Sequence, residues 1–220
     1  MESRVTTFRE FHHEVFKIDN RDEIYRGVRC CDYRLIPKLG RIDQFARGAL
    51  ESSERQMLKL FQNQALPYLN TVPDNLWEWL ALAQHHGLPT RLLDWTRNPL
   101  VAAWYAVERS HDGDSMLYCY ENRNIVDIGR HRNPFKIKEV VKFIPRHLTN
   151  RITVQTGLFT CHPRPRDEFS PASMRKIIIA KEFRRELKNI LWKYGVHRFS
   201  LFPDLDGLCR HIQWLRTITH

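Results

Sequence analysis

The chain has 220 residues, of which 42% are hydrophobic and 11% aromatic, with 11 proline and 9 glycine residues. This composition is that of a globular protein and excludes collagen-like, low-complexity and intrinsically disordered classes. The 35 lysine and arginine residues exceed the 25 aspartate and glutamate residues by ten charges, which favours phosphate-bearing partners such as nucleic acids or nucleotides. A chain of this length can build a complete core in one domain.

The cysteine content and the N-terminal sequence indicate a cytoplasmic setting. Five cysteines without a Cys-x-x-Cys pair argue against both a disulfide framework and a local zinc ribbon. The first 20 residues lack the apolar stretch of a secretory signal. No window approaches the roughly 20 apolar residues of a membrane-spanning helix, so we expect no membrane association.

Helical patterns dominate the first half of the chain. Apolar residues recur at helical spacing, with capping residues at the ends, and one run of strand-forming residues contains a glycine. The spacing predicts helices over residues 7–17, 49–69, 76–85 and 99–107, and a strand over 24–28. A short element over 90–95 precedes the fourth helix.

Strand patterns are more frequent in the second half. Alternating or continuous apolar residues predict strands over 116–120, 139–144, 151–160 and 174–180. Helices are expected over 181–194 and from about residue 204, where Leu205, Leu208, Ile212 and Leu215 recur at helical spacing. The predicted class is a single α+β domain whose helical first half packs on a mixed or antiparallel sheet.

The densest polar stretch lies at residues 84–99, between two apolar helices. It contains amide, imidazole, guanidinium, carboxylate and hydroxyl groups, which must be satisfied internally or face a cleft. Two interpretations stay open. His85, Arg91 and Asp94 either form a buried network that holds a tight turn or line a functional cleft.

Tyr25, Arg26 and Gly27 suggest a second candidate element of a site. An arginine on a strand can hold a phosphate with two hydrogen bonds, and a neighbouring glycine lets a ligand approach the backbone. The alternative is an exposed strand arginine paired with an acidic residue.

A metal site is a weaker hypothesis. The pairs His12-His13 and His85-His86 could be combined with aspartates such as Asp94, but adjacent histidines point in different directions on a helix. We therefore expect no metal. The sequence also lacks a Gly-x-Ser-x-Gly nucleophile elbow, a P-loop and a dinucleotide-binding glycine pattern.

Four blocks in chain order resemble the FRG domain family, named for a Phe-Arg-Gly signature. They are residues 25–61 with Tyr25-Arg26-Gly27, residues 79–99 with Thr90-Arg91-Leu92-Leu93-Asp94-Trp95, residues 151–159, and residues 201–208. Tyr25 stands where the family name has phenylalanine, a change that keeps the ring. The resemblance covers about residues 24–213, which implies an N-terminal helical segment at 1–23 and a tail at 214–220.

The resemblance further implies an arrangement similar to ADP-ribosyltransferases, with a split sheet and NAD as substrate. NAD transfer needs a clamp on the diphosphate, a polar group that orients the ribose, and a carboxylate or amide near the acceptor. The residues implied for cofactor binding are Tyr25, Arg26, Gly27, Arg91, Asp94 and Thr96, and those implied for catalysis are His85, Gln155 and Glu168. A glutamine can position an acceptor but cannot act as a general base.

Three functions follow as hypotheses. The first, implied by the resemblance, is a cytoplasmic toxin or anti-phage effector of bacterial type that uses NAD to modify a macromolecule such as nucleic acid and is neutralised by an antitoxin protein. The second is a non-catalytic nucleic-acid-binding module, whose binding would weaken steeply with salt. The third is a metal-dependent nuclease built on His85, His86 and Asp94.

Overall fold

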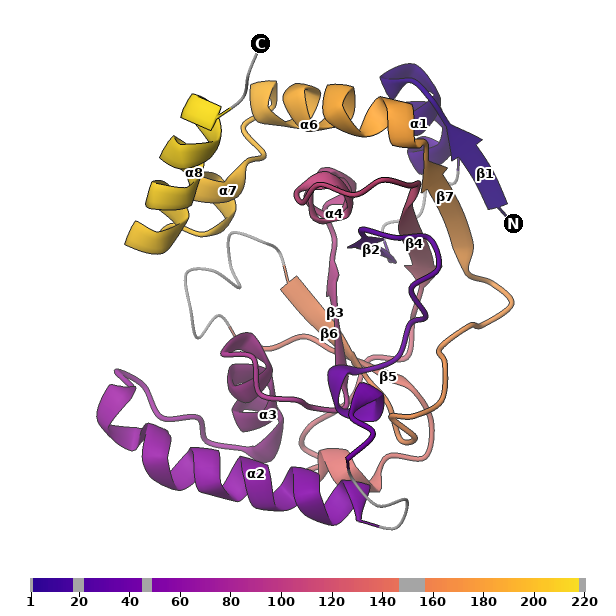
Figure 1. The fold of residues 1–220 in the computed structure, drawn as a ribbon. Helices are drawn as coiled ribbons and strands as arrows, with labels where there is room; N and C mark the ends of the chain where they lie inside the picture. The colour runs from indigo at the N-terminus through magenta and orange to yellow at the C-terminus, as the bar shows by residue number, and fades with distance from the viewer. Residues whose placement is uncertain (1, 18–21, 45–48, 147–156, 218–220) are drawn as a thin grey trace.

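The computed structural model describes residues 2–17, 22–44, 49–146 and 157–217 (Figure 1). The strands are β1 (Glu2–Val5), β2 (Glu23–Val28), β3 (Leu92–Thr96), β4 (Ser115–Glu121), β5 (Val141–Phe143), β6 (Gly157–Cys161) and β7 (Arg175–Ile179). The α-helices are α1 (Phe8–Phe16), α2 (Leu50–Ala65), α3 (Leu76–His85), α4 (Pro99–Val107), α6 (Arg184–Lys193), α7 (Arg198–Leu201) and α8 (Leu205–Thr217). Short 3-10 helices occupy Lys38–Arg41, Leu66–Tyr68, Pro134–Lys136 and Lys181–Phe183.

The described strands form one mixed sheet in the order β1-β7-β4-β2-β3-β6-β5. β1 pairs with β7 in parallel, and the other neighbours pair antiparallel. β2 and β3 are joined through one residue pair, Tyr25 with Thr96. The sheet therefore consists of a larger half-sheet, β1-β7-β4-β2, and a smaller half-sheet, β3-β6-β5. The predicted α+β class is confirmed.

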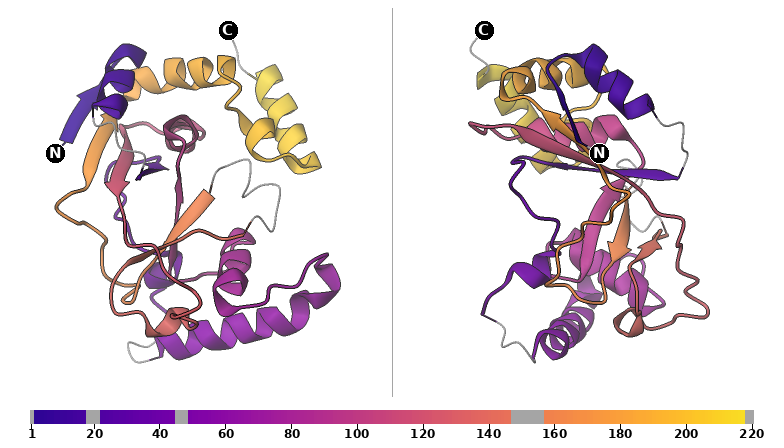
Figure 2. Two further views of the ribbon diagram at one scale, coloured as in Figure 1. Left: turned by 180° about the vertical axis from the view of Figure 1, so that it is seen from behind. Right: turned by 90° about the vertical axis from the view of Figure 1, so that its right-hand side faces the viewer.

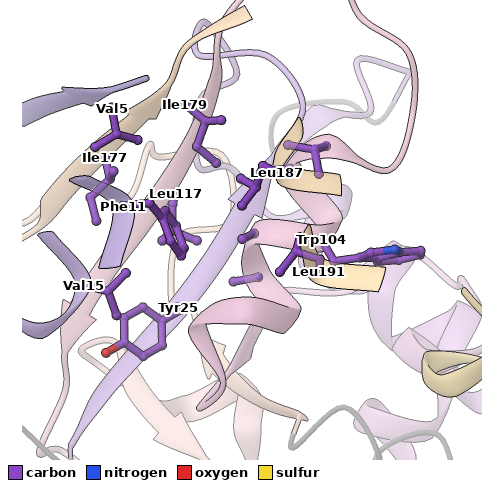
Figure 3. Close-up of a cluster of buried hydrophobic side chains, with 14 of the residues drawn as sticks. Val5, Phe11, Val15, Tyr25, Trp104, Leu117, Ile177, Ile179, Leu187 and Leu191 are labelled. Atoms are coloured by element: carbon purple, nitrogen blue, oxygen red, sulfur yellow. The ribbon is translucent and has the colours of Figure 1, made fainter. Parts of the chain in front are cut away.

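The larger half-sheet carries its own core. Val5 and Phe11 from the N-terminal elements pack with Leu117 and Ile177 of the sheet and with Leu187 of α6 (Figure 3). Helix α4 lies against the same face, and Figure 2 shows α1, α4 and α6 gathered on this side of the molecule. The core thus joins the first elements of the chain to the last strand and the helices after it.

The smaller half-sheet is covered by α2 and α3. Trp77, Leu80 and Ala83 of α3 pack with Leu92 of β3 and Phe159 of β6. A third cluster extends across the junction and contains residues of both half-sheets: Ile24, Leu93, Trp95, Met116, Tyr118 and Leu158. Burying apolar surface on both sides of the junction holds the two half-sheets together where backbone pairing is sparse.

The local predictions agree with most of the described elements. Asn75 caps α3 and Asn98 caps α4, as expected from their positions before apolar helical runs. The strand predicted over 24–28 matches β2, and the helices predicted over 181–194 and from about residue 204 match α6 and α8. Strand β1 was missed because its four residues include only one apolar side chain, Val5. Of the strand expected at 151–160, the described part begins at Gly157.

Val5, Phe11 and Val15 from the N-terminal elements belong to the main core. Helix α8 runs through residue 213 to Thr217. Within the described ranges, every helix is too short or too polar to cross a lipid bilayer.

Candidate functional site

Two adjoining hollows meet at Arg26, at the junction of the half-sheets. The first, which we call the inner pocket, has a volume of about 570 Å³ and is lined by residues such as Lys38, Gln84, His85, Asp94 and Thr96. The second, the arginine pocket, has a volume of about 700 Å³ and is lined by residues of the loop after β2, α4 and α8. Arg26, Gly27, Tyr105 and Arg109 border both, so the two pockets form one continuous cleft.

Arg26 projects from β2 between the two pockets. Its Nη1 donates a hydrogen bond of 2.5 Å to the main-chain carbonyl of Asp94 and lies 3.5 Å from the Asp94 carboxylate. Its Nε is buried and makes no hydrogen bond to any described residue. The side chain is 21% exposed. The contacts with Asp94 of β3 therefore fix the position of the guanidinium, which borders both pockets.

Asp94 presents its carboxylate to the inner pocket. The side chain is 57% exposed and accepts a 3.0 Å hydrogen bond from Nε2 of Gln84. The Gln84 carbonyl accepts a 2.7 Å hydrogen bond from the Thr90 hydroxyl, which fixes the orientation of the amide. Among the described lining residues, Asp94 is the single carboxylate of the inner pocket.

His85 and Thr96 also lie at the inner pocket. His85 is the last residue of α3 and packs edge-on against His86, with ring centroids 5.1 Å apart. The Thr96 hydroxyl accepts a 3.0 Å hydrogen bond from the Asn98 amide, at the turn that leads into α4. The structure thus brings His85, Asp94 and Thr96 together with Arg26.

Arg91 is buried and lines neither pocket, although a cofactor-binding role was expected for it. It is 2% exposed and donates from Nε and from its backbone amide to Glu54 of α2, each at 2.9 Å. This buried, hydrogen-bonded ion pair joins α2 to the start of β3. The interpretation of a buried network is therefore correct for Arg91, but its partner is Glu54 rather than His85 or Asp94. Glu54 and Arg91 are 37 positions apart, so no local sequence pattern predicts that they pair.

Tyr25 and Gly27 border the cleft, but both are packed against the interior of the protein. Tyr25 is 7% exposed, and its hydroxyl donates a 2.8 Å hydrogen bond to Glu23. Burial, followed by the interaction with Glu23, raises the pKa of Tyr25. A Cβ on Gly27 would lie 1.8 Å from the Ala102 carbonyl oxygen, so this glycine permits the close approach of α4 to β2. From the sequence we expected the missing side chain of Gly27 to leave room for a ligand, but in the structure it leaves room for helix α4.

Of the two remaining expected catalytic residues, the structure describes one, Glu168, and it lies away from the cleft. Glu168 forms an ion pair of 2.7 Å with Arg34 and, among the residues described, is outside the lining of both pockets. Gln155 lies outside the described residues. The expectation that Glu168 supplies the catalytic carboxylate is therefore not supported by its position.

Several residues of the cleft were not singled out from the sequence. The arginine pocket gathers Arg29, Arg41, Arg109, Arg198 and Arg210 from distant parts of the chain. Only the overall excess of basic residues hinted at this cluster. Helix α8 contributes through the turn at Asp204–Gly207, where a Cβ on Gly207 would lie 1.9 Å from the Phe202 carbonyl oxygen.

A buried histidine behind the cleft was also missed. His162 is 3% exposed, and its Nε2 lies 2.8 Å from the Thr160 hydroxyl, which accepts a 2.8 Å hydrogen bond from Trp95 Nε1. Burial, with a smaller contribution from the charge of Arg26, lowers the pKa of His162 to about 3. The imidazole is neutral at physiological pH.

No group of three or more histidine, cysteine or acidic side chains within the described ranges is placed to hold a metal ion. His85 and Asp94 share the inner pocket, but His86 does not line it.

The structure is that of an α+β protein with a basic cleft at the junction of two half-sheets. A family model of the FRG domain matches residues 21–115 of the chain, so this part of the chain is similar to that family. No curated protein and no solved structure matches the chain.

Proposed function

We propose that the protein is an NAD-dependent ADP-ribosyltransferase that modifies a macromolecule. The observation that carries this proposal is the juxtaposition of Arg26 with the carboxylate of Asp94 in one cleft. In the reaction, the bond between ribose C1′ and the nicotinamide nitrogen breaks, and nicotinamide leaves with the bonding electrons. An acceptor nucleophile forms a new bond to C1′ and loses its proton to a base or to water.

Arg26 and Arg109 are suited to bind the diphosphate of NAD. Both line the inner pocket and the arginine pocket, so a ligand bound across the junction would contact both guanidinium groups. Guanidinium groups match the geometry of phosphate oxygens and can donate two parallel hydrogen bonds. The volumes of the two pockets fall in the usual range for small-molecule sites.

Asp94 takes the role that the resemblance implied for Glu168. The transition state of glycosidic bond cleavage resembles an oxocarbenium ion, so a carboxylate close to C1′ lowers its energy. Asp94 is exposed to the inner pocket and oriented by Gln84, whereas Glu168 is engaged by Arg34. His85 and Thr96 line the same pocket and are suited to orient the ribose. Gln155 keeps the positioning role that the resemblance implies.

The biological role implied by the resemblance is that of a toxin or an anti-phage effector, neutralised by a partner protein. Expression of the wild-type chain should then arrest growth of the host cell, and expression of the Arg26→Ala variant should not. Normal growth with soluble wild-type protein present would contradict this role.

The direct test of the proposal is nicotinamide release. Purified protein is incubated with NAD and a cell lysate, and free nicotinamide is measured over time. The wild type should release nicotinamide, the Arg26→Ala and Asp94→Asn variants should not, and Arg164→Ala, a change at an arginine that is 82% exposed, should behave as wild type. No release by the wild type, together with salt-sensitive oligonucleotide binding, would favour the non-catalytic binding module instead.

A further inference from the structure

The arginine pocket has an excess of positive charge that its own residues do not neutralise. It is lined by seven arginines and three acidic residues. Three of the arginines have ion-pair partners: Arg26 with Asp94, Arg34 with Glu168, and Arg198 with Glu108. The other four have no carboxylate within ion-pair distance among the described residues: Arg29, Arg41, Arg109 and Arg210.

These charges are crowded. Burial, followed by the charge of Arg26, lowers the pKa of the Arg41 guanidinium. Like charges gathered around one hollow repel each other, and this cost is offset when an anion binds among them. A diphosphate held by Arg26 and Arg109 would leave Arg29, Arg41 and Arg210 available for a second anionic group.

Aromatic rings alternate with arginines along the wall of the same pocket. The Arg29 guanidinium lies 5.8 Å from the centroid of the Tyr33 ring, and that of Arg198 lies 5.0 Å from the Phe202 ring. Both rings line the pocket, and Tyr33 is 46% exposed. Phe202 is half-buried and packs on Trp104 and Tyr105, whereas the exposed Tyr33 ring beside a guanidinium group is suited to stack on an unpaired base while the arginines contact the phosphates.

We infer that the arginine pocket binds single-stranded nucleic acid, with phosphates at Arg29, Arg41 and Arg210 and a base against Tyr33. A single strand is favoured because the bases of a duplex are stacked on each other and cannot reach the rings. This inference rests on the proposed function in one respect: the strand would be the acceptor, held beside NAD at Arg26. Binding itself does not require NAD.

The test measures fluorescence anisotropy of labelled single-stranded DNA and RNA of about 12 nucleotides, without NAD. The Arg29→Ala/Arg41→Ala/Arg210→Ala variant should bind at least about tenfold more weakly than wild type. The slope of the logarithm of the binding constant against the logarithm of the salt concentration should become shallower by about 0.7 for each phosphate contact that the variant removes. Tyr33→Ala should weaken binding with little change in the salt slope, because stacking releases no counterions.

The matched control is Arg130→Ala/Arg132→Ala/Arg164→Ala, which removes the same charge from residues that line neither pocket. Equal weakening by the two triple variants would overturn the inference, because binding would then follow net charge alone. Preference for duplex DNA, or binding of polyglutamate but not of oligonucleotides, would also overturn it. A different result would contradict the proposed function and leave this inference intact. In that case the pocket variant still binds oligonucleotides more weakly than wild type, but the wild-type protein releases no nicotinamide from NAD.

Discussion

The guanidinium of Arg26 on β2 donates a 2.5 Å hydrogen bond to the main-chain carbonyl of Asp94 on β3. This contact crosses the junction at which one residue pair, Tyr25 with Thr96, joins the two half-sheets of the described chain. The same side chain therefore holds the halves together and lines both pockets. Experiments at Arg26 must separate its part in the fold from its part in binding.

Arg26→Ala should lower both stability and nicotinamide release. Loss of a charged donor from a partly buried hydrogen bond costs about 1.5–3 kcal/mol of unfolding free energy. Arg26→Lys can keep one hydrogen bond to the Asp94 carbonyl but lacks the planar fork that binds two phosphate oxygens. We expect Arg26→Lys to unfold near the wild-type denaturant midpoint and still to release nicotinamide poorly. Wild-type turnover by the lysine variant would contradict a role in phosphate binding.

Asp94→Asn should abolish most nicotinamide release without destabilising the fold. The Asp94 side chain is 57% exposed, and an asparagine can still accept the hydrogen bond from Gln84. Loss of a carboxylate that stabilises a cationic transition state costs about 10²–10³ in rate. The measurement is the initial rate at saturating NAD, with the melting temperature as control. Glu168→Gln serves as the comparison and should retain activity.

The buried pair of Glu54 and Arg91 should dominate the stability of the smaller half-sheet. Arg91 Nη2 lies 2.8 Å from the Glu54 carboxylate, and the two side chains are 2% and 1% exposed. Glu54→Ala leaves a buried charge without its partner, which costs about 3–5 kcal/mol. Arg164→Ala, which breaks an exposed pair with Asp167, should cost less than about 1 kcal/mol. Similar urea midpoints for both variants would show that the buried pair contributes little.

Gly27→Ala should destabilise the protein severely. The new methyl group would lie 1.8 Å from the Ala102 carbonyl oxygen, so α4 would have to move away from β2. Gly129→Ala is the control, because its added methyl would meet only a side-chain oxygen of Asp127, at 3.2 Å. We expect little soluble Gly27→Ala protein and a nearly unchanged melting temperature for Gly129→Ala. Equal melting temperatures would contradict the tight packing of α4.

The buried His162 should make the fold sensitive to acid. Its folded pKa of about 3 lies below the value near 6.5 of an unfolded chain, so only the unfolded state takes up a proton between these values. This residue therefore stabilises the fold at neutral pH, and its contribution falls by about 1.4 kcal/mol per pH unit as the pH drops below about 6.5.

His162→Asn removes this titration and keeps a polar partner for Thr160. The difference in unfolding free energy between wild type and variant should shrink by about 2 kcal/mol between pH 7 and pH 5. Urea denaturation at the two pH values measures it, and all other titrating groups are common to both proteins. A constant difference would contradict a buried neutral imidazole.

The sequence predicted the structural features that are determined by residues close together in the chain. Helices α3 and α4 begin where Asn75 and Asn98 accept hydrogen bonds from the first backbone amides, a signal contained within four residues. Arg26 and Arg91 could not be told apart in this way, since both adjoin strand-forming residues. Their different positions depend on Glu54, which lies on another helix. The arginine pocket could not be predicted either, because Arg29 and Arg210 meet only through the tertiary fold.

The parallel pairing of β1 with β7 joins segments that are synthesised early and late, so this part of the sheet can form only late in translation. The first described strand aligns Glu2–Val5 with Lys176–Ile179, contacts that can form only when most of the chain has been made. Closing so long a loop is entropically costly and slows folding. Helix α8, which supplies Arg210, follows later still. An unfinished chain on the ribosome therefore lacks a complete cleft until α8 has been made.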